Sequence, residues 1–186
     1  MHILNKILVN VKALLGDTAD MDRSEVMNMV RDHAEQETDC FYEDAYDWRE
    51  TDTAGRWAQT YPENVLLGSE NPEQLREEIA DAETAQKEEL DTSLQMLEGY
   101  ARMPFNELVQ TLWQRRDSLP VNASSFAADM ATYHIKKVAK LLSGEYFYDS
   151  FFYDTNEYTA RISPNTYKKI QENPEDWALV FFDQHF

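Results

Sequence analysis

The segment WALVFF, residues 177–182, decides how the C-terminal part of this chain is expected to fold. Six consecutive apolar residues rich in aromatic side chains are typical of a buried strand. Upstream, residues 146–153 and 157–162 are rich in aromatic and β-branched side chains and flank Asp154-Thr155-Asn156. This arrangement predicts a β-hairpin. We therefore expect a small antiparallel sheet formed by residues 146–162 and 177–183.

A short helix is predicted between the hairpin and the last strand. Ser163-Pro164 provides an N-cap followed by proline at the first helical position, and Asn173-Pro174 stops the helix. Tyr167 and Ile170 should pack on the sheet. The C-terminal region, residues 146–186, is thus predicted as β-β-α-β.

The first two-thirds of the chain is predicted to be helical, because its apolar residues recur at intervals of three and four. Asn71-Pro72 is the clearest helix start. The expected helices span residues 3–15, from Asp22 to about His33, 38–49, 71–100, from Pro104 to about Asp117, and from Ser124 to Gly144. The predicted fold class is α+β, with a helical region at residues 1–145 packed with residues 146–186 as one domain.

Composition indicates a folded protein of a reducing compartment. The 186 residues are 42% hydrophobic, which is too apolar for a disordered acidic tail. Cys40 is the only cysteine, so no internal disulfide can form. Lys6 and Lys12 interrupt the apolar N-terminal run, which disfavours a signal peptide, and no apolar stretch approaches the roughly 18 residues of a membrane span. These features predict a soluble cytoplasmic protein.

The excess negative charge is concentrated in one part of the chain. The formal net charge is −18, and residues 17–98 alone contain 24 Asp and Glu against 6 Lys and Arg. Such a field repels nucleic acid and attracts basic partners. The sequence therefore predicts a basic, nucleic-acid-handling protein as partner, without direct contact to nucleic acid or membrane. The oligomeric state is left open.

Two acidic segments are candidates for the partner-binding surface. Residues 70–98 hold ten acids and only Arg76 and Lys87 as bases, at a spacing near that of DNA phosphates. Residues 35–52 hold eight acids interleaved with four aromatic residues, a combination that suits guanidinium groups. The alternative for residues 70–98 is a solvated helix face, and the alternative for residues 35–52 is a half-buried helix whose aromatic residues face the core. The candidate partner-binding residues are Glu35, Asp39, Glu43, Asp44, Asp47, Trp48, Glu73, Glu77, Asp81, Glu88 and Asp91.

Enzymatic alternatives have weaker sequence support. Asp149, Asp154, Asp183 and His185 could converge as ligands of a hard divalent cation in a metal-dependent hydrolase. Cys40 near His33 is a second candidate, but surrounding acids raise a thiol pKa and reduce its reactivity. No nucleotide-binding or serine-hydrolase motif occurs. We therefore assign no catalytic residue, metal or cofactor. A structural or regulatory subunit, in which the acids serve solubility alone, is a further alternative.

The chain resembles the small acidic inhibitors that phages and bacterial mobile elements carry against host nucleases, namely antirestriction DNA mimics and anti-CRISPR proteins. The resemblance rests on size, the −18 charge, the acidic and aromatic block from Glu35 to Asp52 and the acidic helix from Asn71. The last 40 or so residues also look like the endings of small accessory proteins of bacterial mobile elements. This resemblance implies a non-enzymatic inhibitor of a CRISPR effector such as Cas9, or of a restriction enzyme.

Overall fold

The computed structural model describes residues 1–98, 106, 107, 109, 110, 113, 114 and 123–186, and of residues 123–129 it describes the backbone alone. The described chain divides into two compact units, one of residues 1–83 with 144–186 and one of residues 84–143. The elements in chain order are β1 (His2–Asn10), α1 (Val11–Leu15), α2 (Arg23–Thr38), η1 (Asp39–Phe41), β2 (Trp48–Glu50), η2 (Gly55–Trp57), β3 (Val65–Leu67), α3 (Pro72–Leu97), α5 (Ala123–Ser143), β4 (Phe152–Asp154), α6 (Pro164–Glu172), η4 (Pro174–Asp176) and β5 (Trp177–His185).

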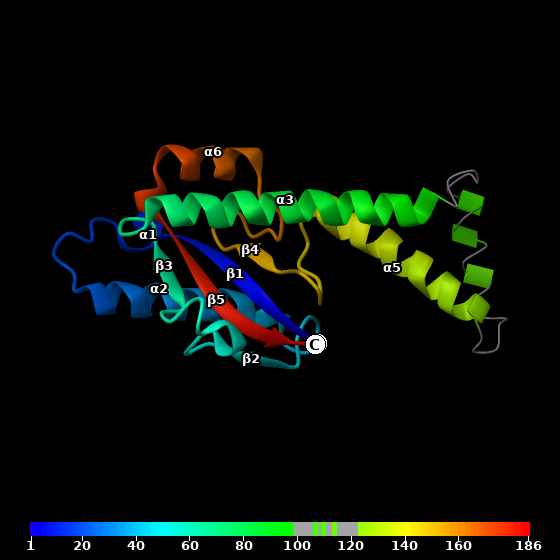
Figure 1. Cartoon of the computed structure of the whole chain (residues 1–186), viewed down its shortest axis with the longest axis horizontal. Coiled ribbons are helices and arrows are strands. Elements are labelled where there is room, and N and C mark those ends of the chain that lie inside the picture. Colours follow the sequence, from blue (N-terminus) through cyan, green and yellow to red (C-terminus); the bar gives the residue numbers. More distant parts are fainter. Residues whose placement is uncertain (99–105, 108, 111–112, 115–122) are drawn as a thin grey trace. The chain divides into compact units, whose positions relative to one another are not determined.

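The first unit is built on a sheet whose central strands come from the two ends of the chain (Figure 1). The described residues form a five-stranded mixed sheet in the order β2-β5-β1-β4, in which β3 also pairs with β5. The longest pairing is antiparallel and runs from His2 opposite His185 to Asn10 opposite Trp177. β4 pairs with β1 in parallel.

Both faces of β1 and β5 are covered, which explains their long apolar runs. On one face, Ile7, Val9 and Phe182 pack against Val26 and Val30 of α2. The other face packs against α3 and α6, through the side chains Leu8, Phe152, Leu179, Phe181, Leu75, Ile79 and Ile170. Strand residues alternate between the two layers because successive side chains point to opposite faces. The sheet is therefore a middle layer with α2 on one side and α3 and α6 on the other.

The predicted fold class is wrong, and the largest error lies at the N-terminus. Residues 3–15 were expected as one helix, but residues 2–10 form β1 and only residues 11–15 are helical. Ile7, Leu8 and Val9 are all buried, because the strand has a helical layer on each face. An apolar run of this kind fits the spacing of a helix as well as that of a two-faced strand. The sheet therefore contains strands from both ends of the chain and is not a small C-terminal sheet.

The predicted hairpin and one predicted helix are also wrong. Of residues 146–162, only 152–154 form a strand, which pairs in parallel with β1, and Asp154 makes one isolated bridge with Thr159. Residues 38–49 form the end of α2, the short η1 and a loop that leads into β2. The positive φ of Glu43, 67°, cannot belong to a right-handed helix.

Several predicted elements are confirmed. β5 contains the WALVFF segment, α6 begins at Pro164 with Ser163 as its N-cap, and α3 begins at Pro72. Ile170 is fully buried, and Tyr167 is partly buried against the same cluster. Asp22 caps α2, and the backbone turns to positive φ at Gly144 just after α5 ends. The helix expected from Pro104 to Asp117 lies largely outside the described residues.

The second unit contains the C-terminal part of α3 and all of α5. Lys137 of α5 donates to Glu89 of α3 at 2.9 Å. One turn further along α3, the side chain of Ser93 lies 3.2 Å from Nδ1 of His134. The order of these two contacts makes the helices antiparallel. Burial lowers the pKa of His134, and the nearby Lys137 charge adds to this effect.

Candidate functional site

The first predicted acidic segment becomes a structured loop at the edge of the sheet. We call residues 39–48 the acidic-aromatic loop. It leaves α2 through η1 and enters β2, the outermost strand beside β5. Backbone hydrogen bonds close it internally: the amide of Ala45 donates to Phe41, and the amide of Glu43 donates to Tyr46. The loop therefore presents its side chains from a fixed backbone.

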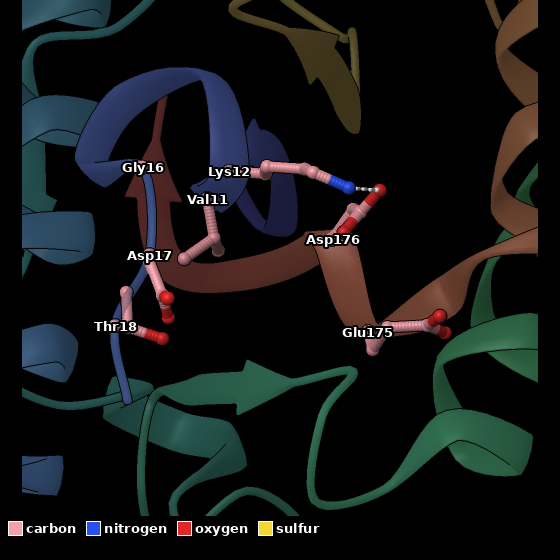
Figure 2. Close-up of a pocket in the computed structure, with 7 residues that line it drawn as sticks. All are labelled: Val11, Lys12, Gly16, Asp17, Thr18, Glu175 and Asp176. Carbon is pink, nitrogen blue, oxygen red and sulfur yellow. Dashed lines mark hydrogen bonds and ion pairs between the residues drawn. The ribbon is translucent and has the colours of Figure 1, made fainter. Parts of the chain in front are cut away.

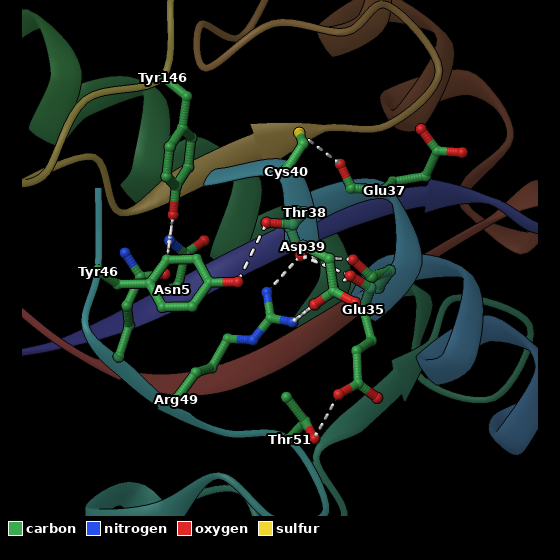
Figure 3. A network of polar contacts seen from close by, with 12 residues as sticks. Asn5, Glu35, Glu37, Thr38, Asp39, Cys40, Tyr46, Arg49, Thr51 and Tyr146 are labelled. Atoms are coloured by element: carbon green, nitrogen blue, oxygen red, sulfur yellow. Dashed lines mark hydrogen bonds and ion pairs between the residues drawn. The ribbon is translucent and has the colours of Figure 1, made fainter. Parts of the chain in front are cut away.

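Arg49 holds this loop from its buried side (Figure 3). Its side chain is only 5% exposed, and its guanidinium donates to Asp39 and to the hydroxyl of Thr38, both at 2.6 Å. The guanidinium carbon also lies 4.8 Å from the ring centre of Tyr46 and 4.9 Å from that of Phe182. The guanidinium is withdrawn from water although Asp39 is 65% exposed, and a cation is attracted more strongly to aromatic rings when it is desolvated than at the surface.

The aromatic residues of the loop divide into an inner and an outer pair. Phe41 stacks on Tyr146, with ring centres 4.3 Å apart, and Tyr46 is buried with its hydroxyl donating to the carbonyl of Thr38. Tyr42 and Trp48 are 54% and 47% exposed. The expectation of a half-buried aromatic side thus describes two of the four rings. The other two are exposed at the surface, where Tyr42 lies edge-on to Tyr46 and Trp48, the strand partner of His185, lies edge-on to His2.

The loop carboxylates differ in how far they are already engaged. Asp39 pairs with Arg49, and Asp47 accepts from Nδ1 of His185 at 2.6 Å. That hydrogen bond lowers the pKa of Asp47. Glu43 and Asp44 are exposed and form no ion pair with a described residue. Glu35 lies just before the loop, in α2, where its carboxylate accepts from Thr51. The free negative charge of the loop therefore sits at its tip.

The second predicted acidic surface lies on the opposite side of the sheet. Glu73, Glu77 and Asp81 are exposed on α3, which packs on the face away from α2. Glu73 pairs with Arg76, whereas Glu77 and Asp81 pair with no described residue. Glu88 and Asp91 are also exposed on α3, but they belong to the second unit. The structure brings Asp39, Glu43, Asp44, Asp47 and Trp48 together and keeps Glu73, Glu77 and Asp81 apart from them.

A second cluster, which the sequence analysis missed in part, adjoins the loop. His2 of β1 and His185 of β5 are cross-strand partners, and their ring centres are 4.9 Å apart. Nδ1 of His2 lies 2.7 Å from Oδ1 of Asp183, whose side chain is 2% exposed. Trp48 touches His2 edge-on, with ring centres 5.8 Å apart. The pairing of β1 with β5 brings His2 here, which no local sequence signal indicates.

Gly55 leaves room for the second oxygen of Asp183 to approach the backbone. Its φ is +52°, and a Cβ built on it would lie 2.4 Å from Oδ2 of Asp183. The following amide, that of Arg56, donates to this same oxygen at 3.0 Å. Glycine is needed here because both the positive φ and the close approach exclude a side chain. Asp183 thus has both carboxylate oxygens occupied.

The four residues of the metal-hydrolase alternative are not brought together. Asp154 is buried at the far side of β1 from β5, where it accepts from the amides of Asn156 and Glu157 and from Thr166. Burial raises the pKa of Asp154. Among the described residues, no three His, Cys, Asp or Glu side chains form a group that could hold a metal ion. Asp183 and His185 serve the cluster beside the loop, and Asp154 organises a turn.

Described residues of the first unit line two open pockets. One of about 450 Å³ lies between α1 and η4 (Figure 2), where Lys12 pairs with Asp176 at 3.1 Å beside Asp17 and Glu175. The other, of about 220 Å³, is lined by Leu14, His33 and Tyr158 among others. Cys40 is exposed, with its thiol directed at the carbonyl of Glu37, so its predicted pairing with His33 has no support. In the first pocket Lys12 is engaged by Asp176, and in the second the hydroxyl of Thr155 donates to the carbonyl of Leu8, so neither pocket presents an activated hydroxyl nucleophile.

Comparison of the chain with protein-family models, with curated proteins and with solved structures finds no match. No helix in the described parts of the chain combines the length and the apolar character needed to cross a membrane. The functional argument therefore rests on the surface itself.

Proposed function

We propose that this protein is a non-enzymatic inhibitor that binds a strongly basic, nucleic-acid-handling protein in the cytoplasm of a bacterial host. The proposed targets are CRISPR effector nucleases such as Cas9, and restriction enzymes. In this proposal the protein occupies the target's nucleic-acid-binding surface and makes no contact with nucleic acid.

The observation that carries the proposal is the acidic-aromatic loop. Tyr42 and Trp48 are large rings left about half exposed in the same loop as Glu43 and Asp44, whose carboxylates form no ion pair with a described residue. Exposed aromatic residues of this kind are enriched at protein interfaces. Because Arg49 and the internal backbone hydrogen bonds hold the loop, its backbone requires little ordering on binding, which reduces the entropic cost.

The chemistry of the loop suits arginine better than lysine on the partner. A guanidinium can stack on a ring while it donates two hydrogen bonds to one carboxylate, whereas an ammonium is a compact, strongly hydrated charge. Nucleic-acid-binding surfaces contain both residues, because both neutralise phosphate. We therefore expect the loop to contact arginine residues of the target.

The test is binding and inhibition measured against purified Cas9 with its guide RNA and against restriction enzymes. Affinity should fall steeply between about 50 and 200 mM salt, as it does for contacts that replace phosphates. The double variant Glu43→Lys/Asp44→Lys should weaken binding by about 10–100-fold. Asp20→Lys/Glu25→Lys, which reverses two exposed acids away from the loop, is the matched control for net charge.

Equal loss in both double variants would show that only the overall field matters and would remove the assignment to the loop. Binding that ignores both salt and the loop substitutions would contradict the proposal. A target recovered from bacterial lysate on the immobilised protein and eluted by salt would identify the class of partner directly.

A further inference from the structure

We infer that His2 and His185 form a binding site for a divalent transition metal of the zinc, nickel or copper type. The site adjoins the acidic-aromatic loop, which contributes Asp47, but the inference does not depend on the proposed partner. Its ligands would be two imidazole nitrogens, with the remaining coordination positions open to water or to a donor atom from a bound protein.

The strand register places the two imidazoles correctly. His2 and His185 are directly opposite each other in the antiparallel pair of β1 and β5. Residues in this position have Cβ atoms about 4.5–5.5 Å apart, so both side chains can reach one point on the same face of the sheet. Their ring centres are 4.9 Å apart. A metal ion needs Nε2 of each ring at about 2.0–2.1 Å. With His2 held on Asp183, the adjustment would come from His185, which is 38% exposed and can rotate about its Cα–Cβ and Cβ–Cγ bonds together with the exposed Asp47.

Each ring is held with the correct nitrogen free. Asp183 and Asp47 are acceptors when ionised, so Nδ1 of each histidine must be the donor in the contacts of 2.7 and 2.6 Å. In the neutral ring the lone pair then lies on Nε2. Neither Nε2 has a hydrogen-bond partner among the described residues. Metal-binding histidines characteristically donate their other ring nitrogen to a carboxylate, which orients the ring and raises its basicity.

The two carboxylates provide different degrees of support. Asp183 is 2% exposed and is fixed by the Arg56 amide, so the ring of His2 is held rigidly. Asp47 is 68% exposed and belongs to the acidic-aromatic loop. A metal bound by His185 would therefore sit next to the loop, where the surrounding negative charge favours a cation.

The metal class follows from the ligands. Imidazole nitrogen suits zinc, nickel and copper, whereas calcium and magnesium prefer oxygen. Copper should bind most tightly, in accordance with the order of stability of divalent ions. The many surface carboxylates can bind any divalent cation weakly, so the test must separate these two kinds of binding.

The experiment uses the full chain without a histidine tag, titrated with Zn²⁺ by calorimetry in excess Ca²⁺ to saturate the carboxylates. We expect one Zn²⁺ per chain. Asp47→Asn, which removes only an orienting carboxylate, should weaken Zn²⁺ binding by roughly 10–100-fold. His185→Gln removes a ligand and should therefore weaken it by more than roughly 100-fold. His33→Gln, on α2, is the matched control and should bind as the unmodified protein does.

A second readout locates the ligands independently of the variants. In NMR spectra of the imidazole nitrogens, Zn²⁺ should shift Nε2 of both His2 and His185 while Nδ1 keeps its proton. Unaltered Zn²⁺ affinity in the double variant His2→Gln/His185→Gln would overturn the inference. So would the absence of Zn²⁺ binding above the Ca²⁺ background in the unmodified protein, or shifts confined to His33.

Discussion

The acidic-aromatic loop and the exposed side of α3 have the same sign of charge but differ in what supports it. On α3, Glu73, Glu77 and Asp81 project from a regular helix whose buried side is purely a packing surface. In the loop, the carboxylates share the surface with two exposed rings and lie above a buried arginine. Charge alone serves solubility, whereas charge with fixed aromatic residues is typical of a binding surface. Tyr46 and Arg49 pack on the α2 side of the sheet, whereas Glu73, Glu77 and Asp81 belong to α3, which packs on the other side, so substitutions can test the two regions separately.

The largest expected effect is on stability, from removing the support under the loop. Arg49→Met keeps the volume but removes hydrogen bonds to charged and polar groups and two ring contacts, and should lower the free energy of unfolding by about 2–4 kcal/mol. Arg76→Met on α3 removes an ion pair one turn away, with Glu73, and a hydrogen bond to the carbonyl of Gln171, and should cost about 1 kcal/mol. Urea unfolding of both variants measures the difference. Equal losses would mean that the loop is no better supported than the helix surface.

The next largest effect is expected on partner binding, which allows the contributions of the loop and of α3 to be compared directly. Glu43→Lys/Asp44→Lys should weaken binding by about 10–100-fold, because two attractions become repulsions at a contact. Glu73→Lys/Glu77→Lys/Asp81→Lys changes more charge but should weaken binding less, through the overall field alone. Affinities at two salt concentrations, with circular dichroism as a folding control, provide the comparison. The reverse order would transfer the partner surface to α3.

The aromatic contribution should be somewhat smaller and confined to the loop. Tyr42→Ala should cost about 1–2 kcal/mol of binding, or roughly 5- to 30-fold in affinity, without altering the salt dependence. Tyr158→Ala is the matched control, since Tyr158 is 69% exposed in a different part of the first unit. If Tyr42→Ala leaves the affinity for the partner unchanged, the loop binds through its charges alone and has no advantage over α3.

The sequence predicted the elements whose signals are local and missed those that depend on distant pairing. α3 and α6 begin where Asn71-Pro72 and Ser163-Pro164 predict, because capping and proline act within a turn. β1 was misassigned because a strand covered on both faces has no alternation to distinguish it from a helix. The register that places residues 2–10 along β5 involves residues about 175 apart in sequence, and no local pattern encodes it.

The candidate site follows the same rule. The excess of acids in residues 35–52 was evident, but which side chains face outward depends on Arg49 turning inward between Tyr46 and Phe182. A guanidinium in an acidic segment is expected at the surface, so its burial could not be foreseen. The juxtaposition of His2 with His185 depends entirely on the pairing of β1 with β5. Composition thus predicted the kind of surface, and tertiary packing determines its residues.

A smaller effect is expected on the melting temperature of the free protein. If the unpaired acids of both surfaces repel one another, added salt should raise the melting temperature, because screening acts over about 10 Å at 0.1 M salt. The complex should weaken under the same change. Calorimetric scans of the free protein from 10 to 300 mM NaCl measure this. A melting temperature that falls with salt would indicate that attraction within the protein outweighs repulsion among its acids, and the case for a basic partner would lose its electrostatic basis.

The smallest expected effect tests how the loop is attached to the sheet. The hydrogen bond from His185 lowers the pKa of Asp47, so Asp47 binds its proton less readily in the folded than in the unfolded protein. Its contribution to stability is therefore complete above the ordinary aspartate pKa, about 3.9, and is lost as pH falls through the lower value of the folded state. Carboxyl NMR titration should find Asp47 titrating below the ordinary range, and His185→Gln should return it there, while His33→Gln should not. Because Asp47 is well exposed, the gain in stability is small, but the titration reports the contact directly. An ordinary titration of Asp47 in the unmodified protein would mean that the loop is not attached to β5 at this point, and its advantage over α3 would then depend on Arg49 alone.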